Sequence, residues 1–166
     1  MEISTINYKD INPSQISLKS LDSKNYDIYY NQKLMFIHTP ILKVENILDI
    51  NSKTYLQLKI SKKSASIQFI NKLIGCENYF NTLHNDGNSI LNSPIIRDLK
   101  NCLSIKVQIS HTFNNIFDSQ RNIIPYNSLK PGYNIKCIIH LSNFYTNHSN
   151  HEIGYSLQLY QLMIIQ

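Results

Sequence analysis

YNIKCIIHLSNFY, residues 133–145, is the stretch that decides the fold. Its apolar side chains recur with a period of two, which indicates a half-buried β-strand because successive side chains point to opposite faces. Four alternate positions predict the buried face: Ile135, Cys137, Ile139 and Leu141. Lys136 and His140 fall on the opposite face, and the strand ends on two aromatic residues, Phe144 and Tyr145. Core packing does not explain why a strand should present cations and rings to solvent.

This strand is one half of a predicted hairpin. The turn signal LKPG (129–132) precedes it, since proline presets φ and glycine accepts positive φ. A polar segment, TNHSNHE (146–152), follows it. The alternating segment GYSLQLYQLMII (154–165) then predicts the partner strand, which carries Tyr155 and Tyr160.

Strict alternation predicts two more strands, at TYLQLKI (54–60) and LSIKVQI (103–109). Tyr55 and Lys59 fall on the outward face of the first strand, and Lys106 falls on the outward face of the second. Both strands therefore repeat the mixture of rings and cations seen in 133–145.

An earlier hairpin is predicted at YDIYYNQKLMFIH (26–38), with its turn at Asn31-Gln32. Pro40 then interrupts the ladder, because proline has no N–H to donate. Residues 1–25 are polar with scattered Ile and Leu, and they predict an N-terminal arm with one short strand.

Residues 64–83 change period and predict an amphipathic helix. The apolar positions near helical spacing are Ile67, Ile70, Leu73, Ile74, Cys76, Phe80 and Leu83. Ser64 is the expected N-cap, and Gly75 costs about 1 kcal/mol in a helix interior.

The pattern as a whole predicts a mainly β fold with one amphipathic helix, arranged as a small Greek-key barrel or sandwich. The small Greek-key, OB-fold-like barrel is the member of that set that we expect. No repeat or linker divides the 166 residues, so we expect one domain overall, with an arm at 1–25 and the OB-fold-like barrel at 26–166.

The composition narrows the class of protein. The net charge is +5 and the pI is about 9.0, which suits an anionic partner such as nucleic acid but is equally explained as a solubility charge. The polar N-terminus lacks a signal-peptide core, and no apolar run approaches the roughly 20 residues that span a bilayer. We therefore expect a soluble, unsecreted chain without membrane contact, whose separated Cys76, Cys102 and Cys137 are free thiols.

Motifs for catalysis are missing from the sequence. HSNHE (148–152) brings His148, His151 and Glu152 together, but in a turn and without a further ligand elsewhere, so we expect a solvated loop and no metal. The chain has four glycines, with no nucleophile elbow and no glycine-rich phosphate loop. We expect neither a cofactor nor enzymatic activity.

The outward strand faces predict a binding surface instead. Bases stack on aromatic side chains for about 1–3 kcal/mol each, and Lys neutralises phosphates. The candidate nucleic-acid-binding residues are Tyr55, Lys59, Lys106, Lys136, His140, Phe144, Tyr145, Tyr155 and Tyr160. Taken singly, each has a structural explanation, since Tyr suits strands, outward Lys guards edges and Phe144 fits a core.

Several stretches resemble a virus-encoded family of single-stranded-DNA-binding proteins, found in short-tailed phages and in nucleocytoplasmic large DNA viruses. They are IYYNQKLMFIHTPIL (28–42) with its Thr-Pro, TYLQLKI with the helix after it, and SLKPGYNIKCIIHLSNFY (128–145) with IGYSLQLYQLMII (153–165). The resemblance covers most of residues 26–165.

This resemblance implies an OB-fold that coats single-stranded DNA in viral replication and recombination, in the host cytoplasm or nucleus. It implies stacking by Phe144, Tyr145 and Tyr155 and a phosphate contact by Lys136. Where the family pattern has a Trp at the end of the penultimate strand, this chain has Phe144-Tyr145 and no Trp anywhere. Phage members end in an acidic tail that recruits replication proteins, whereas this sequence ends in MIIQ, so we expect a divergent member without that mode of recruitment.

Two alternatives stay open on the sequence. The same barrel suits a virion or complex-scaffolding protein, because Tyr is also enriched in protein interfaces. Nothing in the sequence separates DNA from RNA as the partner, and nothing decides between a monomer and a homo-oligomer.

Overall fold

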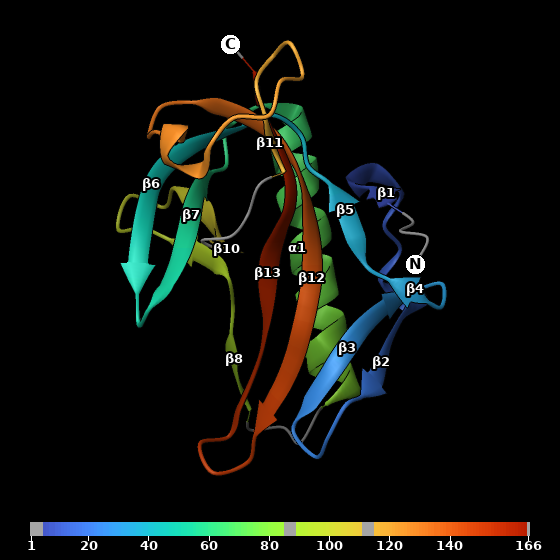
Figure 1. Ribbon diagram of the computed structural model, residues 1–166. Helices are drawn as coiled ribbons and strands as arrows, with labels where there is room; N and C mark the ends of the chain where they lie inside the picture. The colour runs from blue at the N-terminus through green and yellow to red at the C-terminus, as the bar shows by residue number, and fades with distance from the viewer. Residues whose placement is uncertain (1–4, 85–88, 111–114, 166) are drawn as a thin grey trace.

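The computed structural model describes residues 5–84, 89–110 and 115–165 (Figure 1). In these ranges the chain forms thirteen strands, three short 3-10 turns and one α-helix, α1 (Ser64–Leu83). The strands are β1 (Thr5–Asn7), β2 (Ile16–Ser20), β3 (Asn25–Tyr30), β4 (Lys33–Leu34), β5 (Phe36–His38), β6 (Leu42–Ile50), β7 (Lys53–Lys59), β8 (Ile90–Asn92), β9 (Ile95–Arg97), β10 (Leu103–Ile109), β11 (Ile116–Phe117), β12 (Asn134–Asn147) and β13 (Glu152–Ile165). The 3-10 turns are η1 (Tyr8–Asp10), η2 (Pro13–Gln15) and η3 (Tyr126–Ser128).

Five strands close into a ring in the order β12–β6–β7–β10–β13 and back to β12. Four of the five pairings are antiparallel, and β10 with β13 is parallel. In chain order this ring is first–second–third–fifth–fourth, the Greek-key arrangement of the OB-fold. β6 joins β12 at only two residue pairs, Leu42 with Ile135 and Lys43 with Asn134, so the barrel is partly open there. The predicted mainly β, OB-fold-like barrel with one helix is confirmed.

The strand interiors form the core as alternation requires. The four residues predicted to face inward from 133–145 are all buried, at 3% exposure or less. Leu56 and Leu58 of β7 and Val107 of β10 are fully buried opposite them. The strands predicted at 54–60, 103–109, 133–145 and 154–165 match β7, β10, β12 and β13, of which β12 and β13 extend beyond the ring.

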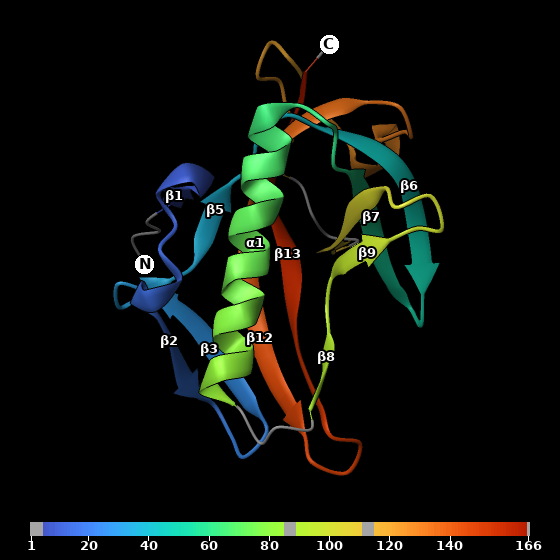
Figure 2. The same cartoon turned by 180° about the vertical axis from the view of Figure 1, so that it is seen from behind.

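α1 lies between β7 and β10 in the chain and covers the barrel on the side opposite the viewer in Figure 1, as Figure 2 shows from behind. Its predicted bounds are confirmed, but the N-cap is Lys63 rather than Ser64, and Lys63 makes no side-chain cap hydrogen bond. Ile67 and Leu83 of the expected apolar face are exposed, while Phe69 is fully buried. Among the described residues, no helix has the length and apolarity to cross a membrane.

The hairpin predicted at 26–38 is confirmed as β3 and β4. Its turn residues Asn31 and Gln32 have φ values of 48° and 65°, the left-handed pair that a tight two-residue hairpin turn requires. The second strand breaks at Met35, which is buried, and resumes as β5.

Residues 5–20 form β1, the turns η1 and η2, and β2. β1 runs parallel to β5, and β2 pairs with β3, which in turn pairs with the far end of β12. Tyr8, Ile11 and Ile16 are buried in the same cluster as the barrel core. The described part of the N-terminal segment is thus packed on the barrel and on α1.

Candidate nucleic-acid interface

Strand register aligns four outward side chains in one row across the barrel. Gln108 of β10 lies opposite Tyr55 of β7 and Gln158 of β13, and Gln158 lies opposite His140 of β12. Side chains opposite one another across paired strands lie close enough to share one ligand. The outward faces of β7, β10, β13 and β12 are therefore continuous on the side of the barrel away from α1 (Figure 1).

Tyr55 and Lys106 form a pair on this surface. The Lys106 ammonium lies 4.9 Å from the centre of the Tyr55 ring, within the range of a cation–π contact. Both side chains are half-buried, so the pair holds a ring and a positive charge in a fixed relation before any ligand binds.

The pair borders an open pocket of about 370 Å³, which we call the tyrosine pocket. Tyr145 lines it from β12, and Lys53 and Lys106 bring positive charge from β7 and β10. The other lining residues are Asn92, Ser93, Pro94, Gln108, Asn143, Tyr155, Ser156, Leu157 and Gln158. No carboxylate is among the lining residues, so the pocket offers rings, cations and neutral hydrogen-bonding groups.

A bulge in β12 directs Tyr145 into this pocket. The pairing of β12 with β13 shifts between Ser142 and Tyr145, and Asn143 has a φ of 52° there. Tyr145 then lies opposite Gly154, and its hydroxyl accepts a hydrogen bond from the Asn92 amide at 2.9 Å. Gly154 leaves room for the ring, because a Cβ there would come within 2.6 Å of it.

An aromatic cluster borders the row at its β12 end. The His140 ring stacks on Phe36 of β5 with centroids 4.5 Å apart, and Tyr160 meets Phe36 edge-on at 4.9 Å. Burial lowers the pKa of His140, against the opposing effect of the Asp27 carboxylate. The buried Nε2 atom of His140 has no hydrogen-bond partner among the described residues.

Phe144 and Tyr155 are buried, which does not suit the predicted stacking of their rings on bases, although Tyr155 contributes to the lining of the tyrosine pocket. Phe144 is fully buried and packs against Phe80 of α1. Tyr155 is 4% exposed, and its hydroxyl donates to Glu77 Oε1 of α1 at 2.9 Å. Burial raises the pKa of both Glu77 and Tyr155. Their hydrogen bond joins α1 to β13.

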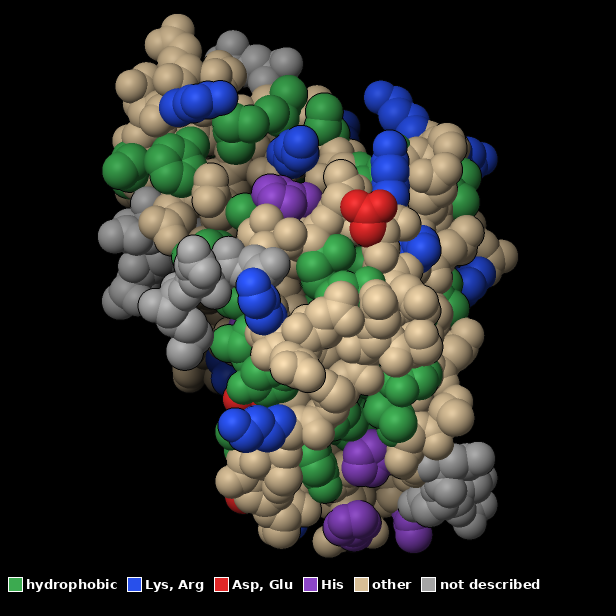
Figure 3. Space-filling model, turned by 90° about the vertical axis from the view of Figure 1, so that its right-hand side faces the viewer, with side chains coloured by type: hydrophobic (Ala, Val, Ile, Leu, Met, Phe, Trp, Pro, Cys, Tyr) green, Lys and Arg blue, Asp and Glu red, His purple; other side chains and the backbone are tan. Residues whose placement is uncertain are grey.

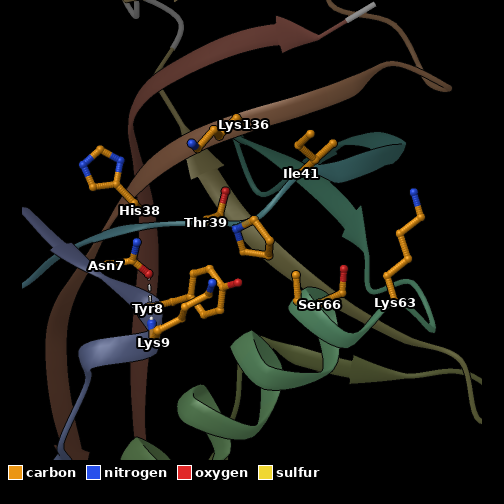
Figure 4. Close-up of a pocket in the computed structure, with 11 residues that line it drawn as sticks. Asn7, Tyr8, Lys9, His38, Thr39, Ile41, Lys63, Ser66 and Lys136 are labelled. Carbon is orange, nitrogen blue, oxygen red and sulfur yellow. Dashed lines mark hydrogen bonds between the residues drawn. The ribbon is translucent and has the colours of Figure 1, made fainter.

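The two remaining predicted lysines lie apart from the tyrosine pocket. Lys59 is exposed near the end of β7 and pairs across the strands with Ser104 and Lys43, outside the residues that line the pocket. Lys136 lines a second hollow, between β1, the β5–β6 connection and the start of α1 (Figure 4). The nine predicted residues are thus divided among the tyrosine pocket with its row, the core, an exposed strand end and a second hollow.

Sequence reasoning missed Lys53, Asn92 and Gln158, which the fold brings to the tyrosine pocket. The outward position of Gln158 could have been predicted, because Gln158 alternates with the buried Leu157 and Leu159. The position of Asn92 could not, since β8 is three residues long and too short to show a period. Among the described residues, no three His, Cys, Asp or Glu side chains are grouped as metal ligands.

The structure is similar over most of its length to solved phage proteins that bind single-stranded DNA. One is gp2.5, a single-stranded DNA binding protein encoded by bacteriophage T7, with a TM-score of 0.56 and 12% identity, covering 79% of this chain and 91% of that one. Another is the single-stranded DNA-binding protein from bacteriophage Enc34, with a TM-score of 0.55 and 10% identity, covering 90% of this chain and 88% of that one. The Enc34 protein in complex with single-stranded DNA gives a TM-score of 0.58 at 9% identity, covering 92% and 96%. No family model and no curated protein sequence matches the chain.

Proposed function

We propose that this protein binds single-stranded DNA without sequence preference and without catalysing a reaction, in viral DNA replication or recombination. The observation that carries the proposal is the tyrosine pocket, where Tyr55, Tyr145 and two lysines meet with no carboxylate among the lining residues. It lies on the outward face of the second and third barrel strands, β7 and β10, where OB-folds bind oligonucleotides. The fold shared with phage single-stranded-DNA-binding proteins supports the same assignment.

Each part of the pocket has a role in this proposal. Tyr55 and Tyr145 stack on successive bases, which any sequence allows because every base has a π-face. Lys53 and Lys106 neutralise backbone phosphates and release counterions. His140 and Tyr160 continue the surface toward β5, and Lys59 adds positive charge at the β7 end.

The first experiment is a titration of a fluorescent oligonucleotide by anisotropy at several salt concentrations. We expect binding at low salt, with an affinity that falls as salt rises, since phosphate contacts release counterions. Absence of binding at low salt, or an affinity independent of salt, would overturn the proposal. Self-association that is insensitive to added DNA would favour the scaffolding alternative, and competition with an RNA oligonucleotide decides between the two nucleic acids.

Substitution of the two tyrosines tests the surface itself. Tyr55→Leu and Tyr145→Leu should each weaken binding by about 5- to 150-fold, the equivalent of about 1–3 kcal/mol for one stacked base. Tyr79→Leu is the matched control, because Tyr79 lies on α1, is partly buried against the core and does not line the tyrosine pocket. Equal affinities for all three variants and the unmodified protein would mean that the DNA binds elsewhere.

A further inference from the structure

We propose that the second hollow, here called the lysine pocket, binds a backbone phosphate of the same DNA strand after it leaves the aromatic surface. This inference rests on the proposed function and extends it with a second contact site. Three lysines line the pocket: Lys9 from η1, Lys63 before α1 and Lys136 from β12. The remaining lining residues are Asn7, Tyr8, His38, Thr39, Pro40, Ile41, Ala65 and Ser66.

The side chains that line the lysine pocket favour binding of an anion. It has a volume of about 620 Å³, is open to solvent, and has no Asp or Glu among its lining residues. Figure 4 shows Lys136 and Lys9 on opposite sides of the hollow, with Lys63 at a third. Among the described residues, no hydrogen bond or carboxylate engages the ammonium groups of these three lysines. Three such cations around one open hollow repel each other, and a phosphate relieves that repulsion.

The surface around the lysine pocket adds to its positive charge. On the side of the molecule that carries β1 and β5, Lys and Arg side chains are spread over the surface and acidic side chains are sparse (Figure 3). α1 begins at the pocket, and its N-cap Lys63 has extended backbone and offers no side-chain acceptor to the first turn. The positive end of the helix dipole therefore adds to the charge of the three ammonium groups.

A continuous surface joins the lysine pocket to the aromatic cluster. Lys136 and His38 also line a smaller hollow with Ile138 and Gln161, on the outward faces of β12 and β13. Lys136 and His140 share the outward face of β12, four residues or about 13 Å apart. A strand that stacks at the tyrosine pocket can cross His140 and reach Lys136 without leaving the surface.

The test uses a substitution that removes one charge without weakening the fold. Lys63→Ser takes away an ammonium group and supplies the missing N-cap hydroxyl, so the urea midpoint of unfolding should rise. Lys9→Gln is combined with it to remove a second charge. Lys62→Ser is the matched control, because Lys62 is the adjacent exposed lysine and does not line the pocket.

For a long oligonucleotide, the slope of log affinity against log salt should fall by about 0.7 in the double variant, the contribution of the one phosphate that the lysine pocket neutralises. Lys62→Ser should keep the full slope. A short oligonucleotide that fills only the tyrosine pocket should bind the double variant and the unmodified protein equally. An unchanged slope for the long oligonucleotide, with binding intact, overturns the lysine pocket and leaves the proposed function standing. Failure of the unmodified protein to bind any DNA overturns both.

A second readout separates a strand phosphate from a free anion. The His38 imidazole lies in the pocket, so its NMR signals report on the occupant. The long oligonucleotide should shift these signals in the unmodified protein and in Lys62→Ser, but not in the double variant. Inorganic phosphate alone should shift them only weakly. A shift with inorganic phosphate that the oligonucleotide does not displace would make this a free-anion pocket and overturn the inference.

Discussion

Gly154 determines where the Tyr145 ring can lie. A Cβ at position 154 would come within 2.6 Å of the Cζ and Oη atoms of Tyr145, inside van der Waals contact. Gly154→Ala should therefore displace the ring from the tyrosine pocket. We expect a loss of about 1–3 kcal/mol in the free energy of unfolding, as for overpacking, together with DNA binding as weak as in Tyr145→Leu.

A double-mutant cycle checks this coupling by urea unfolding and by DNA titration. In a Tyr145→Leu background the obstructing ring is gone, so Gly154→Ala should cost much less stability and no further affinity. Additive effects of the two substitutions would show that Gly154 acts on the strand backbone and not through Tyr145.

His140 makes the stability of the protein depend on pH. Burial lowers the pKa of His140 in the folded chain, whereas the unfolded pKa is about 6.5. The unfolded chain therefore binds the proton more readily, and stability present above about pH 6.5 is lost as the pH falls toward the folded pKa. His140→Gln should reduce the loss of unfolding free energy measured by urea titration between about pH 7.5 and pH 5.5.

Some pH dependence of stability should remain in His140→Gln because of His38. Burial and the neighbouring Lys136 also lower the pKa of His38, which contributes with the same sign. His148→Gln, in the exposed loop after β12, controls for the substitution itself. The assignment to His140 is wrong if His140→Gln and the unmodified protein lose the same free energy on acidification.

Within single elements, the sequence period predicts side-chain direction until a bulge intervenes. In β12 the alternation holds from Ile135 to Leu141, and the extra residue at Asn143 then reverses it. Phe144 consequently turns into the core and Tyr145 turns out. The alternation of apolar residues does not predict such a bulge, because a positive φ at Asn143 does not change the spacing of apolar residues in the sequence. Tyr155 differs from Phe144 in this respect. It shares a strand face with Leu157 and Leu159, so the alternation alone predicts its burial.

At Gly75 the helix α1 can be strengthened. A Cβ there would lie 3.4 Å from Cγ of Pro13 in η2, an ordinary van der Waals contact. Gly75→Ala should raise the free energy of unfolding by about 0.5–1 kcal/mol, because alanine loses less backbone entropy in a helix. Urea unfolding measures the change, and DNA affinity should stay constant because Gly75 lines neither pocket. A lower urea midpoint would mean that η2 cannot tolerate the added methyl group.

At the scale of the whole molecule, the sequence predicts the individual strands better than it predicts how they close into a barrel. The strands at 54–60, 103–109 and 133–145 were readable because each repeats its own period. Closure depends on the parallel pairing of β10 with β13 and on the pairing of β12 with β6, which no local pattern encodes. The candidate site shows the same difference between local pattern and fold. Alternation predicts that Tyr55 and Lys106 face outward, but only the closed barrel shows that Lys136 lines a different pocket.

Residues 5–20 decide whether the N-terminal segment is an arm or a part of the domain. Ile11 is 1% exposed within the common core cluster, and its carbonyl accepts a hydrogen bond from Lys72 of α1 at 2.7 Å. Ile11→Ala should therefore lower the free energy of unfolding of the whole chain by about 2–5 kcal/mol, as for other large-to-small core substitutions. Far-UV circular dichroism and tyrosine fluorescence should report one shared transition, because a segment that is part of the core unfolds with it.

Ile67→Ala supplies the comparison, since Ile67 is 44% exposed on α1 and its truncation leaves no buried cavity. We expect it to cost less than about 1 kcal/mol, so the two variants should differ clearly in urea midpoint. If Ile11→Ala costs no more than Ile67→Ala, or if a separate low-urea transition appears, residues 1–25 form a dispensable arm. The predicted large cost would instead mean that η1, which carries Lys9 of the lysine pocket, is held in place by the same core that closes the barrel.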